Sequence, residues 1–132
     1  MTGFPLKIVT PDGLAFDGMA ESLTVRTVTG DMGIMAKHAD CVAPLGMGEA
    51  TVVVDGKKRY AACIGGMVSV IGGVVNLVPT TFEWSDQIDV ERAEASEKRA
   101  QAVLTNKNAT DTEIQLAKAR LRRALVRKNV RK

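Results

Sequence analysis

Two patterns of apolar and polar positions divide the chain near residue 80. In the first part, short runs such as Ser22–Val28 alternate apolar and polar residues, which is typical of strands with one buried face. Asp55 with Gly56, and Gly72 with Gly73, separate such runs, and both pairs favour tight hairpin turns. The pattern predicts an antiparallel sandwich or barrel of roughly 80 residues.

The second part has the composition and spacing of helices. No glycine follows Gly73 and no proline follows Pro79, so neither residue interrupts it. The stretch from Ile88 to about Leu104 is rich in the good helix formers Ala, Glu, Lys and Arg. A capping box spans Thr110–Glu113 and begins a second helix. The short connection between the two predicts an antiparallel helical hairpin.

These patterns predict an α+β chain with two domains, a β-sandwich over residues 1–84 and a helical hairpin over residues 85–132. Much of the apolar content of the hairpin is alanine, which buries little area per residue. Helices of about 17 residues are marginal alone in water. Two interpretations stay open: a hairpin that detaches as a conformational switch, and a frayed appendage.

Composition narrows the class of protein. The chain has 132 residues, of which 45% are apolar and 25% charged, and this excludes wholesale disorder. Cys41 and Cys63 lie far apart, without partners at metal-ligand spacing, so neither a disulfide scaffold nor a metal site is expected. No apolar run approaches the roughly 20 residues that span a bilayer, and the N-terminus lacks the pattern of a signal peptide. We expect a soluble intracellular protein.

The net charge of +3 is unevenly distributed. From Ile114 onward the chain has eight basic residues and no acidic one. Such a segment suits a nucleic acid, an anionic membrane or an acidic protein surface. The absence of interleaved aromatic residues weakens single-strand binding, and the narrow, alanine-rich apolar face weakens membrane binding. A solvated helix end is the simpler alternative.

Five residues suggest a polyphosphate site. Asp89, Arg92 and Arg99 fall on one face of the first predicted helix. Arg123 and Arg127 share a face of the second. If these faces meet when the hairpin closes, four guanidiniums converge, and guanidinium presents several donors to phosphate oxygens.

A carboxylate such as Asp89 or Glu83 would accept a hydrogen bond from a ribose hydroxyl or an adenine amino group. The simpler alternative makes Asp89 a first-turn acid that pairs with Arg92, with the other arginines solvated. Intrinsic catalysis lacks support, because no phosphate-binding or nucleophile motif is present and nothing surrounds the single histidine, His38.

The order of these pieces resembles the epsilon subunit of the F-type ATP synthases across essentially the whole chain. The most specific piece is Ile88–Ala93, which matches the Ile/Leu-Asp-x-x-Arg-Ala motif of epsilon subunits that bind ATP. The other pieces that carry the resemblance are Val9–Gly13, Gly30–Ile34 followed by His38 and Ala39, and Gly65 and Gly66 before a strand.

The resemblance implies a ten-stranded β-sandwich that attaches the subunit to gamma and to the c-ring, and a two-helix hairpin. In the family the hairpin folds against the sandwich or extends along gamma into the alpha/beta catalytic head, where it blocks ATP hydrolysis. ATP is then a regulatory ligand of the folded form, with no obligatory cofactor. Carried over by position, its site comprises Glu83, Asp89, Arg92, Ala93, Arg99, Arg123 and Arg127.

The resemblance also implies contacts with partners. Asp31 and His38 fall in the loop that resembles the rotor-contacting edge. The family usually has proline where this chain has Ala36, and often where it has Asp40, so we expect a less rigid loop. In the extended hairpin, basic residues of the last helix are expected to meet acidic segments of the catalytic subunits, among them Arg122 and Lys128.

The expected function is therefore a non-catalytic rotor subunit of the proton-translocating ATP synthase. We expect it to lie at the cytoplasmic face of the bacterial membrane as part of the F1 sector, without inserting into the bilayer and without binding nucleic acid or metal. Two alternatives from other classes are a small basic nucleic-acid-binding protein and a free-standing nucleotide sensor.

Overall fold

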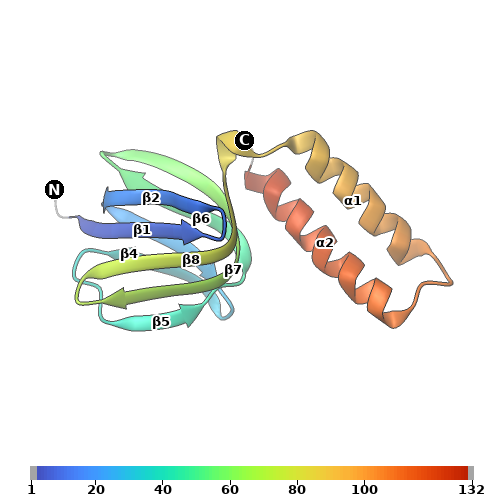
Figure 1. Ribbon diagram of the computed structural model, residues 1–132, viewed down its shortest axis with the longest axis horizontal. Coiled ribbons are helices and arrows are strands. Elements are labelled where there is room, and N and C mark those ends of the chain that lie inside the picture. The colour runs from blue at the N-terminus through green and yellow to red at the C-terminus, as the bar shows by residue number, and fades with distance from the viewer. Residues whose placement is uncertain (1–2, 131–132) are drawn as a thin grey trace. The chain divides into compact units, whose positions relative to one another are not determined.

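The computed structural model describes residues 3–130, and within that range the chain forms eight strands and two long helices (Figure 1). It separates into two compact units, Met1–Trp84 and Ser85–Lys132. The elements are β1 (Phe4–Thr10), β2 (Gly13–Ala20), β3 (Ser22–Thr27), β4 (Gly30–Met35), β5 (Cys41–Pro44), β6 (Met47–Val54), β7 (Lys57–Ile71), β8 (Val74–Trp84), the 3₁₀ turn η1 (Ser85–Gln87), α1 (Val90–Thr105) and α2 (Asp111–Val130).

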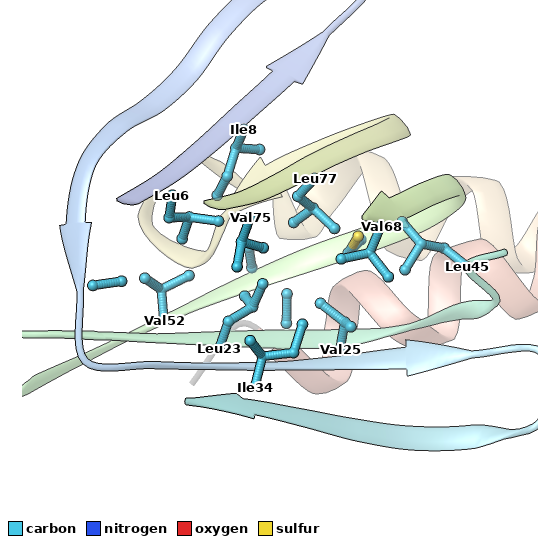
Figure 2. Close-up of a cluster of buried hydrophobic side chains, with 14 of the residues drawn as sticks. Leu6, Ile8, Leu23, Val25, Ile34, Leu45, Val52, Val68, Val75 and Leu77 are labelled. Carbon is cyan, nitrogen blue, oxygen red and sulfur yellow. The ribbon is translucent and has the colours of Figure 1, made fainter. Parts of the chain in front are cut away.

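The strands of the first unit form one sheet that folds over on itself. Their order is β2-β1-β8-β7-β6-β3-β4, with β5 beside the second half of β7. Strands that are far apart in this order share one core: Figure 2 shows Leu6 and Ile8 of β1 opposite Leu23 of β3 and Ile34 of β4. The result is a two-layered sandwich, one of the two architectures that the alternating pattern predicts.

β7 and β8 are long because each passes through both layers. The first half of β7 pairs with β6, its second half pairs with β5, and the halves meet at Gly65 and Gly66. Gly66 has a φ of 98°, and a Cβ there would overlap the carbonyl oxygen of Val78 and the Cα of Pro79, so only glycine fits at this bend. The prediction of ten strands is too high by two, because β7 and β8 continue through the bend instead of breaking there.

One strand pair departs from the antiparallel arrangement. β1 runs parallel to β8, with Leu6 beside Val75 and Ile8 beside Leu77, whereas the other pairs among the described strands are antiparallel. No hairpin connects β1 to β8, so the local sequence pattern does not constrain their relative direction. The expectation of a wholly antiparallel sandwich is wrong at this pair.

Both predicted hairpins form. Asp55 and Gly56 join β6 to β7 with φ values of 52° and 75°, and Gly72 and Gly73 join β7 to β8 with φ values of 58° and 80°. Positive φ at both central residues gives the turn whose twist matches that of the flanking strands.

The second unit is the predicted helical hairpin, α1 and α2 joined by residues 106–110 (Figure 1). α1 begins two residues later than predicted, because Asp89 is its N-cap and accepts a hydrogen bond from the backbone N–H of Arg92 at 3.1 Å. At the start of α2 the Thr110 hydroxyl accepts from the N–H of Glu113 at 3.2 Å, as predicted. The Glu113 carboxylate accepts from the Thr110 hydroxyl at 3.1 Å, and not from its backbone as expected.

Small side chains fill the buried positions of the hairpin. Ala93 and Ala100 on α1, and Ala117 and Ala124 on α2, are buried, and each pair is separated by seven residues, about two helical turns. Among the described residues of the two helices, only Val130 is both buried and larger than alanine. The apolar area that holds the helices together is therefore small, as predicted.

Candidate functional site

A groove of about 660 Å³ lies between α1 and α2. Ala100 and Ala117 form its small-residue wall, and Val103 and Leu116 give it an apolar side. Arginines of both helices complete the lining. The volume is typical of pockets for small organic ligands.

Three arginines of the predicted nucleotide site line this groove. Arg99 is exposed on α1, and Arg123 and Arg127 are half-buried on α2, one turn apart. The closed hairpin therefore brings together guanidiniums from two helices, as the helical spacing predicts. Each guanidinium offers a planar fork of donors that fits phosphate or carboxylate oxygens.

Two charged residues outside the predicted nucleotide site, Arg120 and Glu113, also line the groove. Arg120 lies three residues before Arg123 and seven before Arg127, so helical periodicity alone places all three on one face of α2. Glu113 is the one acidic residue of the lining, and its carboxylate already accepts from the Thr110 hydroxyl. Four guanidiniums against one carboxylate make the groove strongly electropositive.

The other four residues of the predicted set do not line the groove. Asp89 precedes α1, and one of its carboxylate oxygens caps the helix. Arg92 is exposed in the first turn, and Ala93 is buried. Glu83 lies in β8 of the first unit, opposite Ala62. Their role in binding a nucleotide stays a prediction.

Lys128, predicted to contact the catalytic subunits when the hairpin is extended, forms an ion pair within the closed hairpin. Its ammonium lies 2.8 Å from Oε2 of Glu97 on α1. This hydrogen bond, with a smaller contribution from the charge of Glu94, raises the pKa of Lys128 above its ordinary value. Arg122 is exposed and does not line the groove. The predicted contacts of Lys128 and Arg122 with the catalytic subunits stay predictions.

Asp31 and His38 lie at opposite ends of β4, not in one loop as predicted. Asp31 is in the strand, directly opposite Arg26 of β3, and its Oδ1 accepts from Nε of Arg26 at 2.6 Å. Hydrogen bonding to Asp31 raises the pKa of Arg26. His38 follows β4, where Nδ1 lies 2.7 Å from the carbonyl oxygen of Ala39.

Asp40 connects the segment after β4 to the β7–β8 hairpin. Its Oδ1 accepts a hydrogen bond from the backbone N–H of Gly72 at 2.9 Å. His38 donates its own N–H to the carbonyl of Met35 at 3.3 Å and so closes a turn. These contacts tie the loop to β4 and to the β7–β8 hairpin, and the expected lower rigidity of the loop stays a prediction.

A metal site, a reactive buried thiol and a membrane-spanning helix each place requirements on the described residues 3–130. No cluster of three His, Cys, Asp or Glu side chains there could hold a metal ion. Burial raises the pKa of Cys63 to about 12, so its thiol stays protonated and unreactive at neutral pH. No helix in that range is long and apolar enough to cross a membrane.

The first unit has an exposed apolar surface on the outer face of one layer. Met67 of β7 pairs with Val78 of β8, and they are 44% and 50% exposed. Pro44 pairs with Met67 from the other side. In β1, Val9 directly follows Ile8, which pairs with Leu77 of β8, so Val9 comes next to Val78. On its other side, Val9 pairs with Leu14 of β2. These residues form an apolar row across the layer.

A second apolar row lies at the other end of the same strands. Ile71 pairs with Val74 at the hairpin, and Pro5 pairs with Met19. Between the two rows lie polar residues, among them Lys7 opposite Asn76 and Asp17. We call this surface the outer apolar face; it consists of Pro5, Val9, Leu14, Met19, Pro44, Met67, Ile71, Val74 and Val78. Apolar surfaces of this kind, interrupted and rimmed by polar residues, mark sites of protein association.

Comparison with known proteins gives consistent matches along the chain. The family of the ATP synthase delta/epsilon chain β-sandwich domain matches residues 3–85, and that of the delta/epsilon chain long α-helix domain matches residues 86–131. The ATP synthase epsilon chain of Shouchella clausii is 36% identical over 132 residues, which cover 100% of this chain and 97% of the relative. That of Bacillus velezensis is 40% identical over 125 residues, which cover 95% and 94%.

Solved structures share the fold. A chain in the cryo-EM structure of the Euglena gracilis mitochondrial ATP synthase, OSCP/F1/c-ring in rotational state 1, superposes with a TM-score of 0.82 at 23% identity, covering 92% of this chain and 77% of that one. A chain of the Tetrahymena thermophila mitochondrial ATP synthase central stalk and c-ring gives 0.62 at 17% identity, covering 97% and 96%. The predicted fold class, a sandwich followed by a helical hairpin, is confirmed.

Proposed function

The chain belongs to the epsilon-subunit family of the F-type ATP synthases, and we propose that it is a non-catalytic subunit of the central stalk that links gamma to the c-ring. Two further steps belong to this proposal: its hairpin inhibits ATP hydrolysis when extended, and bound ATP holds the hairpin closed. Its place is then the F1 sector, peripheral at the cytoplasmic face of the bacterial membrane.

The outer apolar face supports attachment to gamma through the sandwich. An exposed apolar surface is unfavourable in water, and a partner that covers it gains roughly 25 cal/mol per Å² of apolar area removed from water. The charged residues between the two rows, Lys7 and Asp17, would fix the register of such a contact. A polar nucleic-acid backbone would not cover this surface, so it favours a protein partner.

Attachment can be tested by placing a charge in the outer apolar face. Val78→Asp should abolish co-purification with gamma, because a buried unpaired carboxylate costs more than the lost apolar contact. Thr24→Asp, on an exposed position of β3 in the other layer, is the matched control and should bind normally. Equal binding of both variants would contradict the docking surface.

The groove arginines carry the proposal that ATP is the regulatory ligand. Arg99 on α1 and Arg123 and Arg127 on α2 approach one groove only when the helices lie side by side, so a polyphosphate has more partners in the closed hairpin than in the extended one. A ligand shifts a conformational equilibrium by that difference in affinity. At 100 times its dissociation constant, ATP would stabilise the closed form by about 2.7 kcal/mol. The alanine packing is weak enough for this to decide the position of the hairpin.

Calorimetry on the isolated chain tests the site. Arg99→Gln and Arg123→Gln should each weaken ATP binding about tenfold, whereas Lys118→Gln, an exposed position outside the groove, should leave it within twofold. Asp89→Asn keeps a good N-cap but removes the charge, and so separates capping from binding. No ATP heat with the unmodified chain would reject the nucleotide site.

Inhibition requires the closed hairpin to open. Extension separates Lys128 from Glu97 and frees an ammonium, next to Arg122 in the basic last helix, for acidic segments of the catalytic subunits. Deleting residues 86–132 should therefore raise ATP hydrolysis by the assembled complex. Unchanged or lower hydrolysis, with assembly intact, would count against inhibition by the hairpin.

A further inference from the structure

Arg120 shares the groove with the three predicted arginines but lies outside the residue set that the family motif supplies. On α2, Arg120 precedes Arg123 by three residues and Arg127 by seven, so the three share one face of the helix. All three line the same groove as Arg99 of α1. The three side chains span about 10.5 Å along the helix axis, at 1.5 Å per residue. This length exceeds that of one phosphate group and suits an extended phosphate chain.

The arginine cluster carries an electrostatic cost of its own. Like charges three and four residues apart on a helix destabilise it by a few tenths of a kcal/mol per pair. The lining has four arginines and a single acidic residue, Glu113, and Glu97 of α1 pairs with Lys128. A ligand with several negative charges would remove this repulsion, and a ligand with one negative charge would remove little of it.

We propose that Arg120 is a phosphate ligand of the ATP site and extends it along α2 towards the interhelical loop. The proposal rests on the proposed ATP site and adds a residue to it. Arg120 is exposed, whereas Arg123 and Arg127 are half-buried, so it contributes a solvent-facing guanidinium at the open side of the groove. Its partner is the phosphate chain itself, independent of the base.

The experiment compares two charge-removing variants of one helix in the full chain. Arg120→Gln and Lys118→Gln lie two residues apart on α2, both positions are exposed, and only the first lines the groove. Glutamine is as good a helix former as the residues it replaces, so helicity should not change. Calorimetry at low salt measures binding of ATP and of inorganic tripolyphosphate, which has no base.

Arg120→Gln should weaken both ligands by a similar factor, between threefold and tenfold, and Lys118→Gln should change neither by more than twofold. The difference between the variants should shrink at high salt, because solvent-exposed charges are screened. Equal losses in the two variants would overturn the proposal, since they would show only a general effect of net charge. A loss for ATP but not for tripolyphosphate would also overturn it.

Failure of the ATP site itself gives a different result. If the unmodified chain binds neither ligand, the nucleotide site and the role of Arg120 both fall. If it binds ATP and loses that binding in Arg99→Gln but not in Arg120→Gln, the nucleotide site stands and only the role of Arg120 is wrong.

Discussion

Replacing Gly66 with alanine should destabilise the sandwich more than any other glycine substitution in the bend or the neighbouring hairpin. Gly66 has a φ of 98°, a region that alanine occupies at a cost of about 1–3 kcal/mol. A Cβ there would also overlap the carbonyl oxygen of Val78 and lie 2.7 Å from the Cα of Pro79, and both are backbone atoms that cannot rotate away. We expect a total loss of about 3 kcal/mol or more, a large part of the roughly 5–15 kcal/mol by which domains are stable.

Two neighbouring glycines provide a graded control. Gly72→Ala keeps a positive φ of 58° but meets no atom within 4 Å, so strain alone should cost about 1 kcal/mol. Gly65→Ala places its Cβ 3.1 Å from the hydroxyl of Thr80, a side chain that can move, and should fall between the two. Urea unfolding followed by the fluorescence of Trp84, the single tryptophan and a member of the sandwich core, measures all three.

The urea concentrations at which the three variants unfold test whether the bend requires glycine. Gly66→Ala should unfold at the lowest urea concentration, or fail to fold while Gly65→Ala still folds. Gly66→Ala and Gly72→Ala unfolding at the same concentration would show that the backbone around Pro79 yields easily, and the bend would then not require glycine.

Three other predictions concern parts of the chain that can be tested separately. Cys41 should react with a thiol reagent at pH 8 while Cys63 stays unmodified. Because burial raises the pKa of Cys63 to about 12 in the folded chain, its contribution to stability should be present below pH 9 and lost as pH rises towards 12. Urea unfolding of Cys63→Ala, compared with that of the unmodified chain across this pH range, isolates this decline. Thr110→Ala removes the cap of α2 and should cost about 1 kcal/mol of hairpin stability by circular dichroism, and Thr112→Ala, in the same turn without that contact, should cost less. A fragment of residues 1–84 should keep an all-β circular dichroism spectrum, and an unfolded spectrum would reject an independent sandwich.

The hairpin groove shows how far helical spacing predicts a site. Arg123 and Arg127 share a face by periodicity, and the structure places both beside Arg99. The same periodicity includes Arg120, which could have been found from the sequence by extending the row one turn backwards. Asp89 could not be placed so simply, because a carboxylate at the start of a helix has a choice between its own backbone N–H groups and a ligand, and in the closed hairpin it caps α1.

The sequence alone determined whatever depends on neighbouring residues: alternation along β3, the turns at Asp55–Gly56 and Gly72–Gly73, the capping threonine of α2 and the small, alanine-rich packing area of the hairpin. Only the tertiary structure decided whatever joins distant segments. It set the parallel pairing of β1 with β8, the passage of β7 through both layers, and the contact of Lys128 with Glu97. The physical reason is that periodicity and turn geometry act over a few residues, whereas these contacts depend on which surfaces meet once each element has formed.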